Sequence, residues 1–309
     1  MIKKSARRAA SKNSDKRSKK PDSKSGGVRN KEGKGLPPWK KDGKKRVVEK
    51  KASAAVVSNS VESEDTGLVI GVNPVQALFL DGSRPVEYLA VSKGVGGKRI
   101  QEIVDKARQQ GLRTRFVDRQ TLDGMAGGLA HQGVVARAGI RKQPTFKQLI
   151  SRVRETSDSL LILLDGVEDP QNLGAIIRSA ESFGALAVVL PKDRSAALSA
   201  VAAKASAGAV ERLDVVRVTN LTRSIDELKE NGVQVLGLAG EGARSISEHS
   251  FTGAVALVMG GEGKGLRRLT RDHCDALVAI PITGGVGSLN VSVAAGVALY
   301  AVQRSRGCP

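Results

Sequence analysis

The chain is predicted to be an α/β protein built around a parallel sheet. From residue 160 onward, short apolar runs alternate with longer segments in which apolar residues recur at helical spacing. The run "LLILLD" at 160–165 is apolar except for its last residue, as expected of a parallel strand buried on both faces. Strands that alternate with helices in this way predict a parallel sheet with helices on both of its faces.

Residues 67–140 are predicted to form a smaller α/β unit ahead of that sheet. Its expected helices end at Gly82 and Gly111, because glycine is the usual stop after a helix. The apolar face of the second helix consists of Ile100, Ile103, Val104 and Ala107. The first strand and the first helix are expected within 67–82. Further strands are expected at 85–92, 113–118 and 133–140, and further helices at 97–111 and 119–127.

Residues 141–158 are predicted to be a linker, with a break at Pro144 and a helix after it. The second unit extends over 159–309. Its expected strands are 160–165, 185–190, 213–218, 233–240, 253–260 and 276–282. Its expected helices are 170–184, an Ala-rich 195–209, 220–232, 265–275 and a long C-terminal helix after a loop that starts at 283.

Positive charge is concentrated at the N-terminus. The formal net charge is +19, and residues 1–51 hold 20 Lys and Arg against 5 Asp and Glu. This segment has too few apolar residues to form a core. We therefore predict that 1–66 is a disordered basic arm. Its charge favours contact with nucleic acid, while a solubilising tail and an organelle transit peptide are the alternatives.

Cysteine and histidine usage points away from disulfide and metal chemistry. Cys274 and Cys308 make neither a disulfide framework nor a zinc spacing, which fits a reducing, cytoplasmic compartment. His273, next to Cys274, is expected to be structural. His131 is expected either to contact RNA or to lie in a turn before the last strand of the small unit. No apolar stretch reaches the roughly 18 residues of a membrane helix, so no membrane partner is expected.

Three polar or glycine-rich loops should lie together at one edge of the larger sheet. They follow Leu164, Met259 and Ile282, and ligands of parallel sheets bind beyond the carboxyl ends of the strands. The loop "VMGGEGKGL" at 258–266 fails both common nucleotide-binding patterns. It has Leu where the third glycine of G-x-G-x-x-G should be, and it lacks the first glycine and the Ser or Thr of G-x-x-x-x-G-K-[ST].

Each loop also has an ordinary structural interpretation. Glu262 can be a solvated side chain in a tight glycine turn. Asn172, Ser288 and Asn290 stand at helix starts, where Ser and Asn are usually N-caps. Taken together, three such loops on one edge favour a binding site.

The three loops resemble the motifs of the SPOUT superfamily, and specifically those of the SpoU (TrmH-like) RNA 2'-O-ribose methyltransferases. The matching segments are "NLGAIIR" at 172–178, "VMGGEGKG" at 258–265 and "IPITGGVGSLNVSVA" at 280–294. They occur in the family's order, and the resemblance extends over about 240 residues, 67–305. It is closest to members that act on a guanosine of 23S large-subunit rRNA.

The resemblance implies features of the fold that periodicity does not show. It implies a SPOUT domain over 159–309 whose C-terminal helix passes through a loop to form a trefoil knot. It also implies that 67–140 is an L30e-like domain that binds the RNA substrate. The family is typically a homodimer whose site is completed near the subunit interface.

The resemblance further implies methyl transfer from S-adenosylmethionine (SAM) to a ribose 2'-hydroxyl, without a metal. The catalytic positions are Asn172, Arg178, Glu262, Ser288 and Asn290. The cofactor positions are Gly260, Ile280 and Leu289. The expected partner is 23S rRNA or a large-subunit precursor, and the alternatives are tRNA, another rRNA site, or a non-catalytic ribosome-assembly factor.

A guanidinium normally stays protonated, so Arg178 is expected to orient a phosphate and stabilise a developing alkoxide. Asn172 is expected to position Arg178 or the ribose. Glu262 is expected to hold the arginine or a substrate hydroxyl, and Ser288 and Asn290 to line the substrate side.

Overall fold

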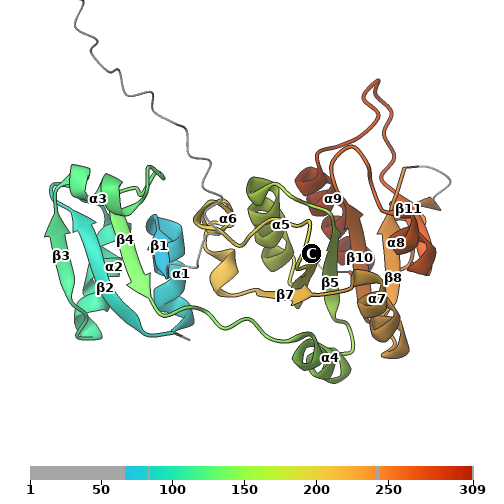
Figure 1. Ribbon diagram of the computed structural model, residues 1–309, viewed down its shortest axis with the longest axis horizontal. Coiled ribbons are helices and arrows are strands. Elements are labelled where there is room, and N and C mark those ends of the chain that lie inside the picture. The colour runs from blue at the N-terminus through green and yellow to red at the C-terminus, as the bar shows by residue number, and fades with distance from the viewer. Residues whose placement is uncertain (1–66, 83, 241–243, 308–309) are drawn as a thin grey trace, which may run out of the picture. The chain divides into compact units, whose positions relative to one another are not determined.

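The structure is a computed structural model that describes residues 67–82, 84–240 and 244–307; the predicted basic arm lies outside these ranges. The larger sheet has seven strands in the order β7-β6-β5-β10-β8-β11-β9, and all neighbouring pairs are parallel (Figure 1). The strands are β5 (Leu160–Asp165), β6 (Ala187–Pro191), β7 (Asp214–Val218), β8 (Gln234–Leu238), β9 (Arg244–Ser245), β10 (Val255–Gly260) and β11 (Ala276–Ala279). The predicted parallel sheet is confirmed, and only the two-residue β9 is new.

Helices cover both faces of this sheet. One face packs against α5 (Pro170–Ser182), α6 (Ala200–Ala205) and α9 (Val291–Ser305). The other packs against α4 (Phe146–Glu155) and α7 (Leu221–Glu230), with α8 (Arg268–His273) beside α7. Along β5, Leu160, Ile162 and Leu164 enter one layer, and Leu161 and Leu163 enter the other. This is why the strand is apolar at consecutive positions.

The helices that carry predicted site residues have well-defined starts. The Asp169 carboxylate caps α5 and accepts a hydrogen bond from the backbone N–H of Asn172 (3.3 Å), with Pro170 in the first turn. Asn290 caps α9, and its Oδ1 accepts from the backbone N–H of Ser292 (2.8 Å). Asn290 therefore does have the N-cap role that its position suggests.

The Ala-rich pattern predicts one helix over 195–209, and this prediction is wrong. α6 is a six-residue helix that begins after its N-cap, Ser199. It cannot continue, because Ala207 and Gly208 both have left-handed backbone conformations, with φ of 53° and 95°. A single turn of 3-10 helix, η1 (Ala209–Glu211), follows.

The smaller sheet has four strands in the order β1-β4-β2-β3. β4 is antiparallel to both neighbours, whereas β2 and β3 are parallel. The strands are β1 (Leu68–Ile70), β2 (Val86–Ser92), β3 (Thr114–Val117) and β4 (Val134–Ala138). α1 (Val72–Asp81) and α2 (Lys98–Gln109) pack on one face and α3 (Arg119–Met125) on the other. The predicted apolar face of α2 is buried.

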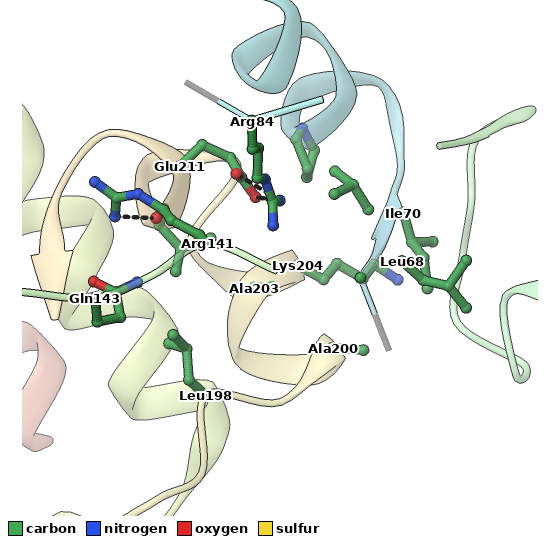
Figure 2. A pocket seen from close by; sticks show the side chains of 14 residues that line it. Leu68, Ile70, Arg84, Arg141, Gln143, Leu198, Ala200, Ala203, Lys204 and Glu211 are labelled. Atoms are coloured by element: carbon green, nitrogen blue, oxygen red, sulfur yellow. Dashed lines mark hydrogen bonds and ion pairs between the residues drawn. The ribbon is translucent and has the colours of Figure 1, made fainter. Parts of the chain in front are cut away.

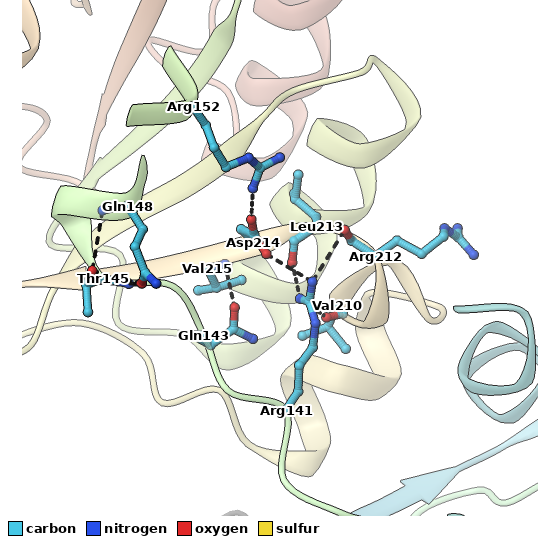
Figure 3. A network of polar contacts seen from close by, with 10 residues as sticks. All are labelled: Arg141, Gln143, Thr145, Gln148, Arg152, Val210, Arg212, Leu213, Asp214 and Val215. Carbon is cyan, nitrogen blue, oxygen red and sulfur yellow. Dashed lines mark hydrogen bonds and ion pairs between the residues drawn. The ribbon is translucent and has the colours of Figure 1, made fainter. Parts of the chain in front are cut away.

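The segment after β4 is anchored to the larger sheet before α4 begins (Figure 3). The Arg141 guanidinium donates to the backbone carbonyl of Leu213 (2.5 Å) and pairs with the Asp214 carboxylate (3.0 Å). Gln143 Oε1 accepts from the backbone N–H of Val215 (2.9 Å). The segment predicted as a linker is therefore held along the start of β7.

A buried ion pair joins the loop between α1 and β2 to η1. Arg84 Nη2 is 2.7 Å from Glu211 Oε2, and the side chains are only 9% and 5% exposed. The pair borders a small cavity of about 50 Å³, which Leu68 and Lys204 also line (Figure 2). Burial raises the pKa of Glu211, while Arg84 and then Arg141 oppose that rise.

Two histidines outside the motifs have structural partners. Gly133 N–H donates to Nδ1 of buried His131 (3.0 Å), which favours the turn interpretation over RNA contact. Nδ1 of His273 lies 2.7 Å from the Asp226 carboxylate, in keeping with its expected structural role.

Candidate functional site

Three segments far apart in the sequence meet through hydrogen bonds between side chains. Nδ2 of Asn172 donates to Oε1 of Glu262, and Nδ2 of Asn290 donates to Oδ1 of Asn172 at 3.1 Å. Asn172 is 8% exposed, so these bonds satisfy an almost buried amide. We call Glu262, Asn172 and Asn290 the polar chain. It brings the three predicted loops together at one edge of the sheet.

A hollow of about 770 Å³, here called the main hollow, opens beside the polar chain. Glu262 and Asn290, the two ends of the polar chain, both line this hollow. Other residues of its wall are Leu238, Met259, Gly260, Ile280, Ser288 and Leu289. Its volume is within the range of small-molecule sites, roughly 300–1,000 Å³, and its wall mixes apolar side chains with a few polar groups.

The loop after β10 needs its glycines for its own backbone packing. A Cβ at Gly260 would lie 2.0 Å from the carbonyl carbon of Gly265, and one at Gly261 would lie 2.2 Å from the carbonyl oxygen of Gly166. Gly263 has a left-handed φ of 74°. These glycines therefore let the loop close on itself and against the turn after β5.

Asp165, the last residue of β5, supports this loop. Its carboxylate accepts from the backbone N–H of Arg267 (2.9 Å) and lies 3.4 Å from Nη1 of the same residue. Its backbone carbonyl accepts from the N–H of Gly261 (2.9 Å). Asp165 and Arg267 are not among the site residues predicted from the sequence, although a lone acid at the end of an apolar strand is a signal for Asp165.

Arg178 is not part of this arrangement. It is six residues after Asn172 on α5, about 9 Å along the helix axis and about 120° around it. Its side chain is exposed and lines neither the main hollow nor the small cavity beside Arg84. Glu262 hydrogen-bonds to Asn172 and not to the arginine, which was one of the expected partners.

The site offers amide groups, one carboxylate, one hydroxyl and the cations of Lys264 and Arg271. This set can orient a ligand hydroxyl and accept a hydrogen bond from it. In the described ranges, no group of three or more His, Cys, Asp and Glu side chains is placed to hold a metal ion. Nor does any helix of those ranges have the length and apolar character needed to cross a membrane.

A parallel sheet with a ligand-sized hollow at the carboxyl ends of β8, β10 and β11 defines an α/β ligand-binding domain. Comparison with known families makes the class specific. The pattern of the SpoU rRNA Methylase family matches residues 159–300, and that of the RNA 2'-O ribose methyltransferase substrate binding family matches residues 68–144. The chain belongs to the SpoU rRNA Methylase family.

Two relatives align with this chain over nearly their whole length. The chain is 44% identical over 239 residues to 23S rRNA (guanosine-2'-O-)-methyltransferase RlmB of Haemophilus influenzae, an alignment of 77% of this chain and 97% of the relative. It is 41% identical over 239 residues to the protein of the same name in Escherichia coli, covering 77% and 98%.

Solved structures show the same fold. The SpoU methyltransferase AviRb from Streptomyces viridochromogenes, in complex with the cofactor AdoMet, aligns with a TM-score of 0.66 at 25% identity, over 78% of this chain and 91% of that one. The AdoMet-bound rRNA methyltransferase from Sinorhizobium meliloti aligns with a TM-score of 0.62 at 25% identity, over 77% and 86%.

Proposed function

We propose that this chain transfers a methyl group from SAM to the 2'-hydroxyl of a guanosine ribose in 23S rRNA, in the cytoplasm. Family membership supports methyl transfer to RNA. The names of the two RlmB relatives support guanosine and 23S rRNA as the target. The observation that carries the proposal is the polar chain at the rim of a ligand-sized hollow.

The residues of the main hollow fit SAM. The exposed apolar side chains of Ile282 and Leu289, with partly buried Ile280, can cover a planar ring. In the described chain, residues 281–289 make no hydrogen bond, so their backbone groups are available to the edge of that ring. SAM, when bound, supplies a methyl group that is already electrophilic.

The polar chain fits the task of holding the ribose. Asn172 engages Oε1 of Glu262, which fixes the carboxylate and leaves Oε2 to accept a hydrogen bond from the 2'-hydroxyl. Asn290 holds Asn172 in turn. Ser288 is exposed on the wall of the main hollow, where its hydroxyl can contact the RNA.

Arg178 fits this scheme as a residue supplied by a second subunit. Val293, Val297 and Tyr300 are 52%, 39% and 56% exposed, and their spacing places them on one face of α9. An apolar stripe of this kind is typical of an interface. α5, which carries Arg178, packs against α9, so a homodimer formed on this stripe would bring the arginine toward the partner's site.

Mixed dimers test this arrangement. Asn172→Ala and Arg178→Ala chains, each inactive as a homodimer, should form mixed dimers in which one of the two sites is intact, so each mixed dimer should regain about half of the wild-type activity. Mixed dimers that stay inactive would contradict a shared site, and a monomer in sedimentation would contradict the dimer itself.

Two features of the fold belong to the same proposal. The four-stranded unit, which matches the substrate-binding family at 68–144, would be an L30e-like domain that holds the RNA. α9 returns from β11 to pack against α5 and β10, and this return supports the trefoil knot expected of the family. The domain limits at 140 and 159 are part of the proposal as well.

Two measurements test the function. Titration with SAM should release heat, whereas a non-catalytic assembly factor should give none. Ribose methylation mapping of rRNA from cells with and without the protein should show one guanosine of 23S rRNA that loses its 2'-O-methyl group. A lost mark on tRNA, or at another rRNA position, would replace the proposed target.

A further inference from the structure

A second hollow, of about 460 Å³, borders the same loop after β10. Gly261, Glu262, Lys264 and Gly265 line both this hollow and the main one. The rest of its wall comes from Asp165 and the turn after it, from Arg194 in the loop after β6 and from Arg267. Glu262 is therefore common to two hollows, of which only the main one has a role so far.

Most carboxylates of the second hollow already have partners. Its four carboxylates are Asp165, Glu168, Asp169 and Glu262. Three of them are engaged, with Arg267, with the N-terminus of α5 and with Asn172 respectively. Glu168 is exposed and, within the described chain, has neither an ion pair nor a hydrogen bond. Apart from Oε2 of Glu262, which the proposed function assigns to the ribose, Glu168 is thus the carboxylate of this hollow that is left for a ligand.

The cations divide in the same way. Arg267 is engaged by Asp165. Arg194 and Lys264, both exposed, have no partner among the described residues. Arg194 also has a left-handed backbone, with φ of 54°, which is uncommon for a residue other than glycine. The free groups of this hollow are therefore one acceptor and two donors.

We propose that the second hollow receives the base of the target guanosine. Guanine presents N1–H and N2 amino donors next to its O6 and N7 acceptors, so one base needs both a carboxylate and cations. Glu168 accepts from the donors, and Arg194 and Lys264 donate to the acceptors. A phosphate fits less well, since four carboxylates line the hollow against three cations.

The shared wall connects this inference to the reaction. A base in the second hollow leaves its ribose at the boundary with the main hollow, where Glu262 lies. The sugar hydroxyl then meets the polar chain, and the base is recognised away from the cofactor. The inference rests on the proposed function and deepens it by naming the residues that select guanine.

Single-atom changes in the RNA test it. The substrates are a synthetic rRNA fragment with guanosine at the mapped position and the same fragment with inosine, which lacks the N2 amino group. The wild-type enzyme should prefer guanosine in kcat/KM by about tenfold. Glu168→Ala should bring the ratio close to one, whereas Asp193→Ala, an exposed acid beside Arg194 that does not line the hollow, should leave it unchanged.

The cations have a parallel test with 7-deazaguanosine, in which a C–H group replaces the N7 acceptor and the N1–H and N2 donors are kept. Lys264→Ala should reduce the preference for guanosine over 7-deazaguanosine several-fold, with Lys192→Ala as the matched control. SAM titration of each variant shows that it is folded, and the inosine result with wild-type enzyme stands without any variant. Methyl transfer with no preference for guanosine, or a preference that Glu168→Ala preserves, overturns the base assignment alone. No methyl transfer to any RNA overturns the proposed function.

Discussion

The two walls of the main hollow differ in how they are held. The fixed wall consists of residues 260–266, which line the main hollow, and of residues 165–172 and 267, which support them. It is tied together by Asp165, Asn172 and the close backbone packing of its glycines. The open wall, residues 281–289, is exposed at every position and makes no hydrogen bond in the described chain. It carries exposed apolar side chains instead, including Ile282 and Val286.

This difference suggests a division of labour between the walls. Buried, satisfied hydrogen bonds keep a polar group in one orientation, which suits the positioning of a reacting hydroxyl. An exposed segment with few contacts has low local stability and can adjust to a ligand. We infer that the polar chemistry is set in advance, while the apolar cover takes its final form with SAM and RNA.

The largest expected effect comes from breaking the fixed wall at its centre. Asn172→Ala removes both hydrogen bonds of the polar chain, so methyl transfer should fall by about 100- to 1,000-fold. Methyl incorporation from labelled SAM measures this, and SAM titration should show that binding is kept. Gln171→Ala, an exposed neighbour, is the control. Near wild-type turnover of Asn172→Ala would contradict the positioning role.

The thiol reactivity of Cys274, which follows α8, reports how tightly the side chains next to the fixed wall are packed. Burial, with a smaller effect of Asp275, raises the pKa of its thiol to about 11. At pH 8 the thiolate fraction should be about 100-fold below that of an ordinary thiol. In a Cys308→Ser chain, alkylation should be at least that slow, should speed up with rising pH, and should reach the ordinary rate in denaturant. Rapid alkylation of the folded protein would show that this region opens.

A smaller effect should follow from removing the support of the loop. Asp165→Ala leaves the backbone N–H of Arg267 without its acceptor, so unfolding should become easier by about 2 kcal/mol. Urea denaturation measures the change. Asp193→Ala, an exposed acid, should change stability by less than about 0.5 kcal/mol. Equal stabilities of the two variants would mean that Asp165 does not support the wall.

The smallest effect is expected at the open wall. Saturating SAM should slow amide hydrogen exchange of 281–289 by about tenfold, because binding stabilises the form that it contacts. The amides of Gln171 and Asn172 should change little, since both already donate to the Asp169 carboxylate. Equal protection of both walls, or none at the open wall, would remove the contrast between them.

Local patterns were sufficient to predict most of the fold. The alternation of apolar runs, the continuous β5 and the glycine stops at 82 and 111 each depend on neighbours in the chain, so they can be recognised without the structure. The Ala-rich helix failed because the left-handed turn at 207–208 depends on its surroundings, not on helix propensity. The two-residue β9 is too short to show a period.

The candidate site was predictable only in part. Motif resemblance selected Asn172, Glu262 and Asn290, but their hydrogen bonds span 90 and 118 positions, which spacing cannot reveal. The same limit hid the contact of Asp165 with Arg267 and the separation of Arg178 from the polar chain. The roles of the selected residues remain predictions for the experiments above.

The bond between Asn172 and Asn290 also has a consequence for biosynthesis. Its two partners are 118 residues apart in the sequence. A ribosome exposes Asn172 long before it exposes Asn290, so the polar chain stays incomplete while these 118 residues are synthesised. The site can form only after α9 has left the exit tunnel and docked, and a product terminated before α9 would lack Asn290.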